Sequence, residues 1–274
     1  STMYGKGEIY NTYFAVEPRV GLVFVIPSIG SSVKAAYSHT SQSVLLGSNS
    51  NGGMPLDVWF PVNKHIKPQH SDQYTIGFFK NFLDNKLEAS VEVYYKTISN
   101  LIDFKDNAQL IANYNIETEI LTGKGRSYGI ELLLRKNVGK VTGWLSYTYS
   151  RSFRTVKGIS LDQEYRSPFD RPHNFVAVLS YDINDRINVS ANWIYNTGQP
   201  VPYPSGKMQY GNKLIPIYSG ERNGYRYDDY HRLDLSATIK GKERKRIPWR
   251  GEWNFSVYNA YGRKNTWAVF FSQD

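Results

Sequence analysis

Apolar and polar residues alternate with a period of two along many segments of this chain. In segment 187–196 every odd position is apolar, and every even position except Ile194 is Asn or Ser. Successive side chains of a β-strand point to opposite faces, so this pattern predicts a strand with one apolar and one polar face. Segment 174–183 has the same alternation, and only residues 184–186 separate the two, which predicts a hairpin with a tight turn.

The same pattern predicts about eleven strands in all. The segments are 20–26, 33–41, 74–82, 89–96, 127–135, 141–150, 174–183, 187–196, 232–239, 253–257 and 266–271. The connections between them alternate in length. Short connections are expected at 27–31, 83–86, 138–140, 184–186 and 241–250, and long ones at 44–71, 101–125, 155–171 and 199–228.

Regular alternation of short and long connections places all short turns at one rim of the sheet and all long loops at the other. Outer-membrane barrels have this arrangement, with short periplasmic turns and long extracellular loops. We therefore predict an all-β fold, an antiparallel transmembrane β-barrel with about 10–11 up-and-down strands. Free strand edges in lipid leave backbone groups without hydrogen bonds, so we expect these strands to belong to a larger barrel.

Aromatic residues on the apolar face gather near the long-loop ends of the strands. They are Tyr95, Tyr147, Tyr149, Trp193 and Tyr195. Tyr and Trp favour the boundary between lipid and water, so their position favours a membrane barrel. A soluble β-sandwich also has alternating strands, but its strands are usually shorter and its connections less regular.

Composition narrows the possibilities further. The mean hydropathy of −0.49 does not argue against a membrane barrel, because only alternate strand residues of a barrel face lipid. The absence of cysteine excludes disulfides and thiolate chemistry. The net charge of +9 is spread along the chain apart from a basic run at 240–250, so we expect no nucleic-acid partner and read that run as a solvated turn.

Several short motifs resemble those of TonB-dependent outer-membrane receptors, particularly the Bacteroidetes type. In chain order they are EPRVG at 17–21, KPQHSDQY at 67–74 with Gly77, GRSYGIE at 125–131, FDRPHN at 169–174, TGQP at 197–200, YHRLD at 230–234, and VYNAY at 257–261 with KN at 264–265. Each motif alone is weak. Their order and spacing make the resemblance specific, and it covers nearly the whole chain.

The resemblance implies that residues 1–274 are the C-terminal portion of a 22-stranded barrel, with the plug domain and the final strand outside this chain. It implies import of a nutrient of the glycan, peptide, siderophore or cobalamin type. The implied partners are the lipid bilayer, lipopolysaccharide, the TonB complex through the plug, and a surface lipoprotein. Neither enzymatic activity nor a cofactor is expected. The alternatives are a passive porin, an assembly scaffold, or a soluble β-sandwich adhesin or lectin.

Two sets of candidate site residues follow from the predicted faces and loops. Substrate contact is expected from aromatic residues of the long loops, although loop packing explains them equally well: Trp59, Phe60, Tyr203, Tyr210, Tyr218, Tyr225 and Tyr227. The lumen-facing charged residues are Glu92, Lys96, Glu131, Arg135, Arg232 and Asp234.

Two histidines lie close to carboxylates in the sequence, His173 near Asp170 and His231 near Asp228 and Asp229. Such pairs can bind metals or transfer protons. With no third ligand or nucleophile in a suitable position, we expect hydrogen-bond networks at the barrel rim, and no catalytic or metal site.

Overall fold

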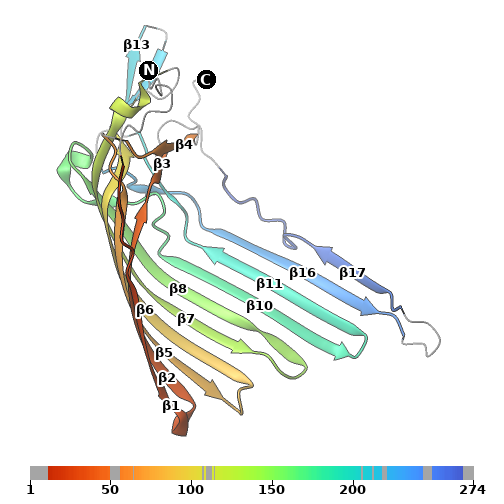
Figure 1. The fold of residues 1–274 in the computed structure, drawn as a ribbon. Helices are drawn as coiled ribbons and strands as arrows, with labels where there is room; N and C mark the ends of the chain where they lie inside the picture. Colours follow the sequence, from red (N-terminus) through yellow and green to blue (C-terminus); the bar gives the residue numbers. More distant parts are fainter. Residues whose placement is uncertain are drawn as a thin grey trace.

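The computed structural model describes residues 12–49, 56–63, 65–106, 108, 113, 115–204, 206–211, 213–217, 221–242 and 249–267. One antiparallel sheet contains ten strands that each pair with their neighbours along the sheet. They are β1 (Arg19–Ile26), β2 (Ser31–Gln42), β5 (Gln69–Phe82), β6 (Leu87–Phe104), β7 (Ile120–Lys136), β8 (Val141–Val156), β10 (His173–Asn184), β11 (Ile187–Asn196), β16 (Tyr230–Lys240) and β17 (Glu252–Val257). Figure 1 shows them as a single curved wall. The same sheet contains the short strand β9 (Tyr165–Arg166), which pairs with β8. The all-β antiparallel prediction is confirmed, and the two-sheet sandwich is wrong for the described residues.

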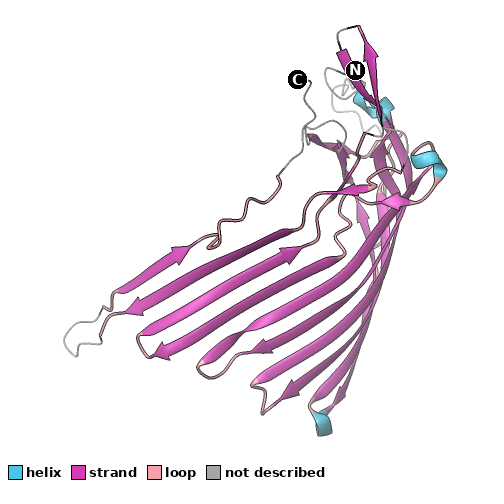
Figure 2. Ribbon diagram, turned by 180° about the vertical axis from the view of Figure 1, so that it is seen from behind, coloured by secondary structure: helices cyan, strands magenta, loops and turns pink. Residues whose placement is uncertain are grey.

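The connections alternate in length as predicted, and the long ones carry the smaller elements. These are β3 (Val44–Asn49), β4 (Leu56–Pro61), η2 (Ile116–Glu119), η3 (Ser160–Asp162), β9 (Tyr165–Arg166), β12 (Pro200–Val201), β13 (Gly206–Tyr210), β14 (Lys213–Ile217) and β15 (Tyr225–Arg226). Of the small elements in the described residues, only η1 (Pro27–Ile29) lies in a short connection. Figure 2 shows the small elements gathered at one end of the wall and η1 at the other. We call these ends the long-loop rim and the short-turn rim.

The largest differences from the predicted boundaries lie in β6 and β7 and in the last expected strand. Residues 101–104 and 120–125, expected in a long loop, extend β6 and β7. The pairing shifts between Ser99 and Leu101, and Asn100 takes a φ of 56°, so a bulge interrupts the alternation there. In the last expected strand, 266–271, the first two residues are not in a strand and the others lie outside the described residues.

The register aligns apolar residues into continuous rows across the sheet. One row of directly paired residues consists of Phe24, Val33, Phe78, Val91, Leu132, Tyr147, Phe175 and Tyr195. The neighbouring row on the opposite face is polar from β6 onward: Glu92, Glu131, Thr148, Asn174 and Asn196. One face of the wall is therefore an apolar band, here called the outer face, and the other is a polar inner face.

The buried hydrophobic clusters of the described residues lie at the long-loop rim rather than on the sheet. One consists of Leu45, Phe60, Ile66, Ile102 and Phe104, and the other of Leu101, Val156, Ile159 and Tyr165. Many large apolar side chains of the outer face, by contrast, are exposed. Contiguous apolar surface of this extent indicates a membrane or an interaction partner. Among the described residues no helix is long and apolar enough to cross a membrane.

Candidate functional site

A buried ionic network lies where the long connections meet at the long-loop rim. Asp103, at the end of β6, accepts hydrogen bonds from Arg222 Nη2 at 2.8 Å, Arg154 Nη1 at 3.0 Å and Tyr165 Oη at 2.8 Å. Arg222 also donates to the Phe104 carbonyl at 2.8 Å. The side chains of Asp103 and Arg222 are both 3% exposed, so each charge depends on the other for stabilisation.

A second buried carboxylate, Asp170, joins the same connections. It accepts hydrogen bonds from the Ser152 amide at 2.7 Å and Arg151 Nε at 3.2 Å, and it forms an ion pair with Arg226. Nearby, the Asn223 amide group donates to the Arg166 carbonyl at 2.8 Å. We call the ends of β6 and β8, η3, β9, residues 167–170 and residues 221–226 together the rim cap. Its buried charges fix the connection after β11 onto the connections after β6 and β8.

The connection after β11 requires a glycine at its start, Gly198. A Cβ built on Gly198 would lie 1.7 Å from the Tyr227 carbonyl oxygen, so only glycine fits there. The Gly198 amide donates to Asp229 Oδ1 at 2.9 Å, and Tyr195 Oη donates to Oδ2 at 2.6 Å. The TGQP segment therefore allows the two ends of the long connection to come together.

The pKa values of Tyr165 and Asp229 at this rim are shifted. Burial, together with the neighbouring Asp103 carboxylate, raises the pKa of the Tyr165 hydroxyl well above its usual value. The hydrogen bond from Tyr195 lowers the pKa of Asp229, and the Gly198 amide and the charge of Arg263 act in the same direction. Tyr165 thus stays a neutral donor and Asp229 a charged acceptor near neutral pH.

The aromatic residues proposed for substrate contact lie in different connections. Tyr203 and Tyr225 form a tilted ring pair with centroids 5.0 Å apart, and the residues are 56% and 53% exposed. Trp59 is exposed on β4, which belongs to a different connection, the one between β2 and β5. Tyr227 is half-buried, and its amide donates to the Gln199 carbonyl at 3.0 Å.

The remaining aromatic candidates give a different result. Phe60 is wrong as a contact residue, because it is buried in the cluster with Leu45 and Phe104. The Tyr210 backbone belongs to β13, and Tyr218 lies outside the described residues. The exposed pair of Tyr203 and Tyr225 is thus the aromatic surface that the structure brings together.

The charged residues predicted to face the lumen all lie in the strands of the main sheet. Glu92 and Glu131 are direct cross-strand partners, which places two like charges side by side. Arg232 pairs with Asp234 at 2.8 Å on β16. These four residues lie on the polar inner face of the sheet.

The two remaining residues of this set lie on neighbouring strands. Arg135 Nη1 lies 4.0 Å from Glu88 Oε2. Lys96 is paired in register with Gln73 and Ser127. A wall lined in this way offers polar contacts to a solute or to another domain.

The two histidines take part in hydrogen bonds at the rim. His173 Nδ1 lies 2.9 Å from Tyr147 Oη, and its ring stacks on that of Tyr147. His231 Nδ1 lies 2.8 Å from Tyr261 Oη, while the backbone of His231 is bonded to the side chain of Asn265. Among the described residues, no three His, Asp or Glu side chains are grouped as metal ligands.

Sequence reasoning missed the residues that organise the rim cap. Asp103 lies at the end of β6, Tyr165 and Arg222 lie in two different long connections, and no local spacing links the three. Asp170 belonged to a recognised motif, but its burial against Arg151 and Arg226 was not foreseen. Isolated charged residues in long loops were the only available signal.

The chain resembles known proteins both in its sequence profile and in its structure. The sequence profile described as TonB dependent receptor-like, beta-barrel matches residues 2–260. Among curated proteins, no sequence matches the chain. Similar solved structures, given with their sequence identities, include the ferric-catecholate import receptor Fiu from Escherichia coli K12 in its closed form (18%), the ferripyoverdine receptor of the Pseudomonas aeruginosa outer membrane bound to ferripyoverdine (16%), and FpvAI in complex with pyocin S2 (15%).

The structural likeness to these three proteins extends over most of the chain. Their TM-scores are 0.55, 0.57 and 0.58, and each alignment covers 90% of this chain. The same alignments cover 31%, 29% and 30% of the other chains. At these identities the likeness shows the fold, and the chain spans about a third of the length of the structures it matches.

Proposed function

Because the chain belongs to the family of TonB-dependent receptor-like β-barrels, we propose that it forms the C-terminal part of the barrel of an outer-membrane nutrient transporter. The motif order supports the Bacteroidetes type and a complete barrel of 22 strands. In such a protein a plug domain occupies the lumen and couples import to the TonB complex. The family consists of receptors and transporters, and we propose no enzymatic activity.

The observation that carries this proposal is the two-faced wall. Its outer face is a continuous apolar band suited to lipid, and its inner face is polar and charged. The inner charges, such as Glu131 and Arg232, are then available to a passing solute or to the plug. Lipid and lipopolysaccharide would contact the outer face, and a surface lipoprotein would meet the long-loop rim.

We assign first contact with the nutrient to the rim cap and the exposed ring pair of Tyr203 and Tyr225. Binding residues are often carried by loops on a rigid scaffold, and the buried ionic network makes this scaffold rigid. Glycans, peptides, siderophores and cobalamins all suit aromatic and polar contacts. The named functions of the structural neighbours make ferric siderophores the first class to test.

A passive porin with the same strands is the main alternative, and transport energetics separate the two. The full-length protein would be purified from outer membranes and inserted into planar bilayers, and uptake of a radiolabelled ferric catecholate would be measured in cells with and without TonB. A plugged transporter should show no steady open conductance, and its uptake should require TonB. Steady conductance with TonB-independent uptake would establish a porin instead.

The role of the ring pair can be tested in the same assay. Replacing Tyr203 and Tyr225 with alanine should reduce uptake of the ferric catecholate about tenfold or more, since each aromatic contact contributes on the order of 1 kcal/mol. Trp249→Ala is a matched control, because Trp249 is an exposed aromatic residue near the short-turn rim. Equal uptake by both variants would remove the ring pair from the binding site.

A further inference from the structure

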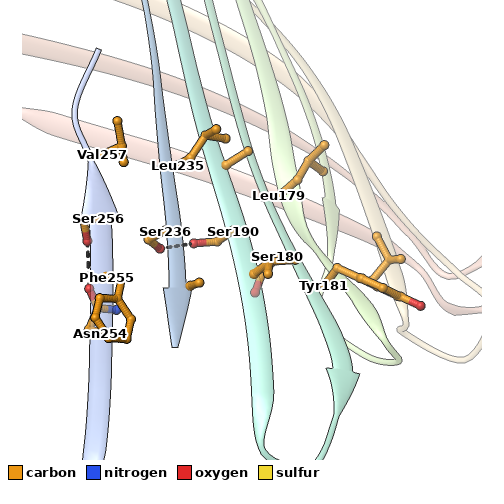
Figure 3. A pocket seen from close by; sticks show the side chains of 14 residues that line it. Leu179, Ser180, Tyr181, Ser190, Leu235, Ser236, Asn254, Phe255, Ser256 and Val257 are labelled. Atoms are coloured by element: carbon orange, nitrogen blue, oxygen red, sulfur yellow. Dashed lines mark hydrogen bonds between the residues drawn. The ribbon is translucent and has the colours of Figure 1, made fainter. Parts of the chain in front are cut away.

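The outer face has a groove across the last five strands of the main sheet. Its volume is about 950 Å³, and its lining comes from β8, β10, β11, β16 and β17. Figure 3 shows lining side chains on β10, β11, β16 and β17, among them Leu179, Leu235 and Val257. The intervening serines alternate to the inner face, where Ser190 and Ser236 hydrogen-bond at 2.7 Å. The groove is therefore an apolar feature of the outer face.

Differences in side-chain size across two rows of paired residues produce the groove. One row runs Leu179, Ala191, Leu235 and Val257, and the next runs Tyr181, Val189, Ala237 and Phe255. The small side chains of Ala191 and Ala237 form the floor on β11 and β16. The two alanines are diagonal to each other, because Ala191 is paired with Leu235 and Ala237 with Val189. Leu179 and Tyr181 on β10 and Phe255 and Val257 on β17 flank these two strands.

The groove leads toward the short-turn rim. From Ala191 to Ile187 the strand advances about 13 Å, at about 3.3 Å per residue. The last apolar row is Ile187, Ile239 and Trp253, and Trp253 is largely exposed. Trp favours the boundary between hydrocarbon and lipid headgroups. The lower end of the groove thus has the character of a membrane interface.

Basic residues lie directly beyond that apolar row. The described cations are Lys140, Arg186, Lys240, Lys242 and Arg250, and the described carboxylates are Asp182, Asp185 and Glu252. Backbone contacts hold two of the cations in place: Arg186 Nε donates to the Lys240 carbonyl at 3.0 Å, and Arg250 Nε donates to the Gly241 carbonyl at 2.7 Å. Five cations against three carboxylates leave an excess of two positive charges among these described residues.

We propose that this groove binds a phospholipid with an anionic headgroup, in the membrane leaflet next to the short-turn rim. An acyl chain would lie over Ala191 and Ala237, between the flanking side chains of β10 and β17. The phosphate would meet the cations of the turns at this rim, Arg186 and Lys242 among them, because basic residues beside an apolar surface attract anionic headgroups. The proposal rests on the membrane placement in the proposed function and adds a specific lipid to it.

Native mass spectrometry of the full-length, detergent-purified protein tests this directly. The probes are phosphatidylglycerol and phosphatidylcholine with identical acyl chains. The wild type should retain one phosphatidylglycerol, with a preference of about tenfold over phosphatidylcholine, since each basic residue near the headgroup contributes about fivefold. Added salt should weaken that preference, because the cations are solvent-exposed.

Two variants separate the acyl and headgroup contributions. Ala191→Leu with Ala237→Leu fills the floor and should abolish retention of both lipids. Ala35→Leu is its control, since Ala35 is exposed and pairs with the outer-face residues Leu22 and Ile76, on strands far from the groove. Arg186→Glu with Lys242→Glu should remove the preference for phosphatidylglycerol. Its control is Lys124→Glu, at the long-loop end of β7.

The outcomes distinguish this inference from the proposed function. Outer-membrane fractionation and heat-modifiable gel migration of the same samples test the membrane placement. A protein that passes those tests but binds the two lipids equally, or is unaffected by filling the floor, would overturn the lipid site alone. A dimer peak that disappears on filling the floor would instead identify the groove as a contact between two copies, and would also overturn it.

Discussion

Arg222 and Asp103 form a buried ion pair between residues that are 119 positions apart in the chain. Arg222 Nη2 and Asp103 Oδ1 lie 2.8 Å apart, and Arg222 also reaches Asp106 at 3.0 Å. The pair connects the segment before β15 to the end of β6. A rim assembled in this way holds its loops in one arrangement.

Replacing Arg222 with methionine should loosen the rim cap without unfolding the sheet. Removing one member of a buried ion pair leaves an uncompensated charge and costs about 3–5 kcal/mol. Hydrogen exchange followed by mass spectrometry should show amides of residues 160–170 and 221–226 exchanging at least about a hundredfold faster, since about 2.8 kcal/mol corresponds to a hundredfold change.

Arg171→Met provides the comparison for that experiment. Arg171 is exposed and donates to Gln199 Oε1 at 3.1 Å, so its loss should change exchange by less than about fivefold. If the two substitutions gave equal exchange, the buried pair would have no special role in holding the cap. Exchange within β10 and β11 should stay slow in both variants.

Gly198→Ala should separate the two ends of the connection between β11 and β16. The added methyl group would lie 1.7 Å from the Tyr227 carbonyl oxygen, and relieving such a contact costs about 1–3 kcal/mol or more. Faster exchange at residues 225–229 would report the displacement. Gly206→Ala is the control, because a Cβ there meets no atom within 4 Å, and its exchange should match that of the wild type.

The strands of the main sheet were predictable because lipid imposes a strict alternation on them. A strand such as β11 must keep one apolar face along its whole length, so its sequence has an apolar residue at every second position. Where β6 extends beyond the lipid-facing part of the sheet, the alternation of apolar and polar residues ends. The bulge at Asn100 breaks the alternation, and Leu101 and Phe104 then pack into clusters of the rim itself.

The candidate site was less accessible to sequence reasoning. Inner-face residues such as Glu131 and Arg232 follow from strand parity alone. The pairing of Arg222 with Asp103 depends on how a long connection folds over the end of β6, and no periodicity encodes that. Phe60 was predicted to contact substrate but is buried. An aromatic residue in a loop can belong to a local core as readily as to a binding surface, and the sequence does not distinguish the two.

The pKa shift of Asp229 predicts a specific acid sensitivity. The pKa of this carboxyl is lowered in the folded protein from its ordinary value of 3.8, first by the Tyr195 hydroxyl and then by the Gly198 amide. Its stabilising contribution is therefore complete above pH 3.8 and is lost as the pH falls through the lower, folded value. Pepsin cleavage within 197–229 should accelerate below pH 3.8 in the wild type.

Asp229→Asn is the matched variant for the acid experiment. Asparagine keeps an acceptor for one donor but cannot change charge in this range. Cleavage of this variant within 197–229 should be faster than that of the wild type at pH 5 and should change less on acidification. A variant with the same acid-induced acceleration as the wild type would assign the pH dependence to other carboxyl groups.

The assignment of faces can be tested at two adjacent residues, since the chain has no cysteine. Ala191 is paired with Leu179 and Leu235 on the outer face, and Asn192 with Val178 and Asp234 on the inner face. In outer membranes, Ala191→Cys should react with a lipid-soluble maleimide and Asn192→Cys with a charged one. A register slip of one residue would reverse the two reactivities. Equal labelling of both cysteines by the charged reagent would mean that water reaches both faces, which a wall embedded in lipid does not allow.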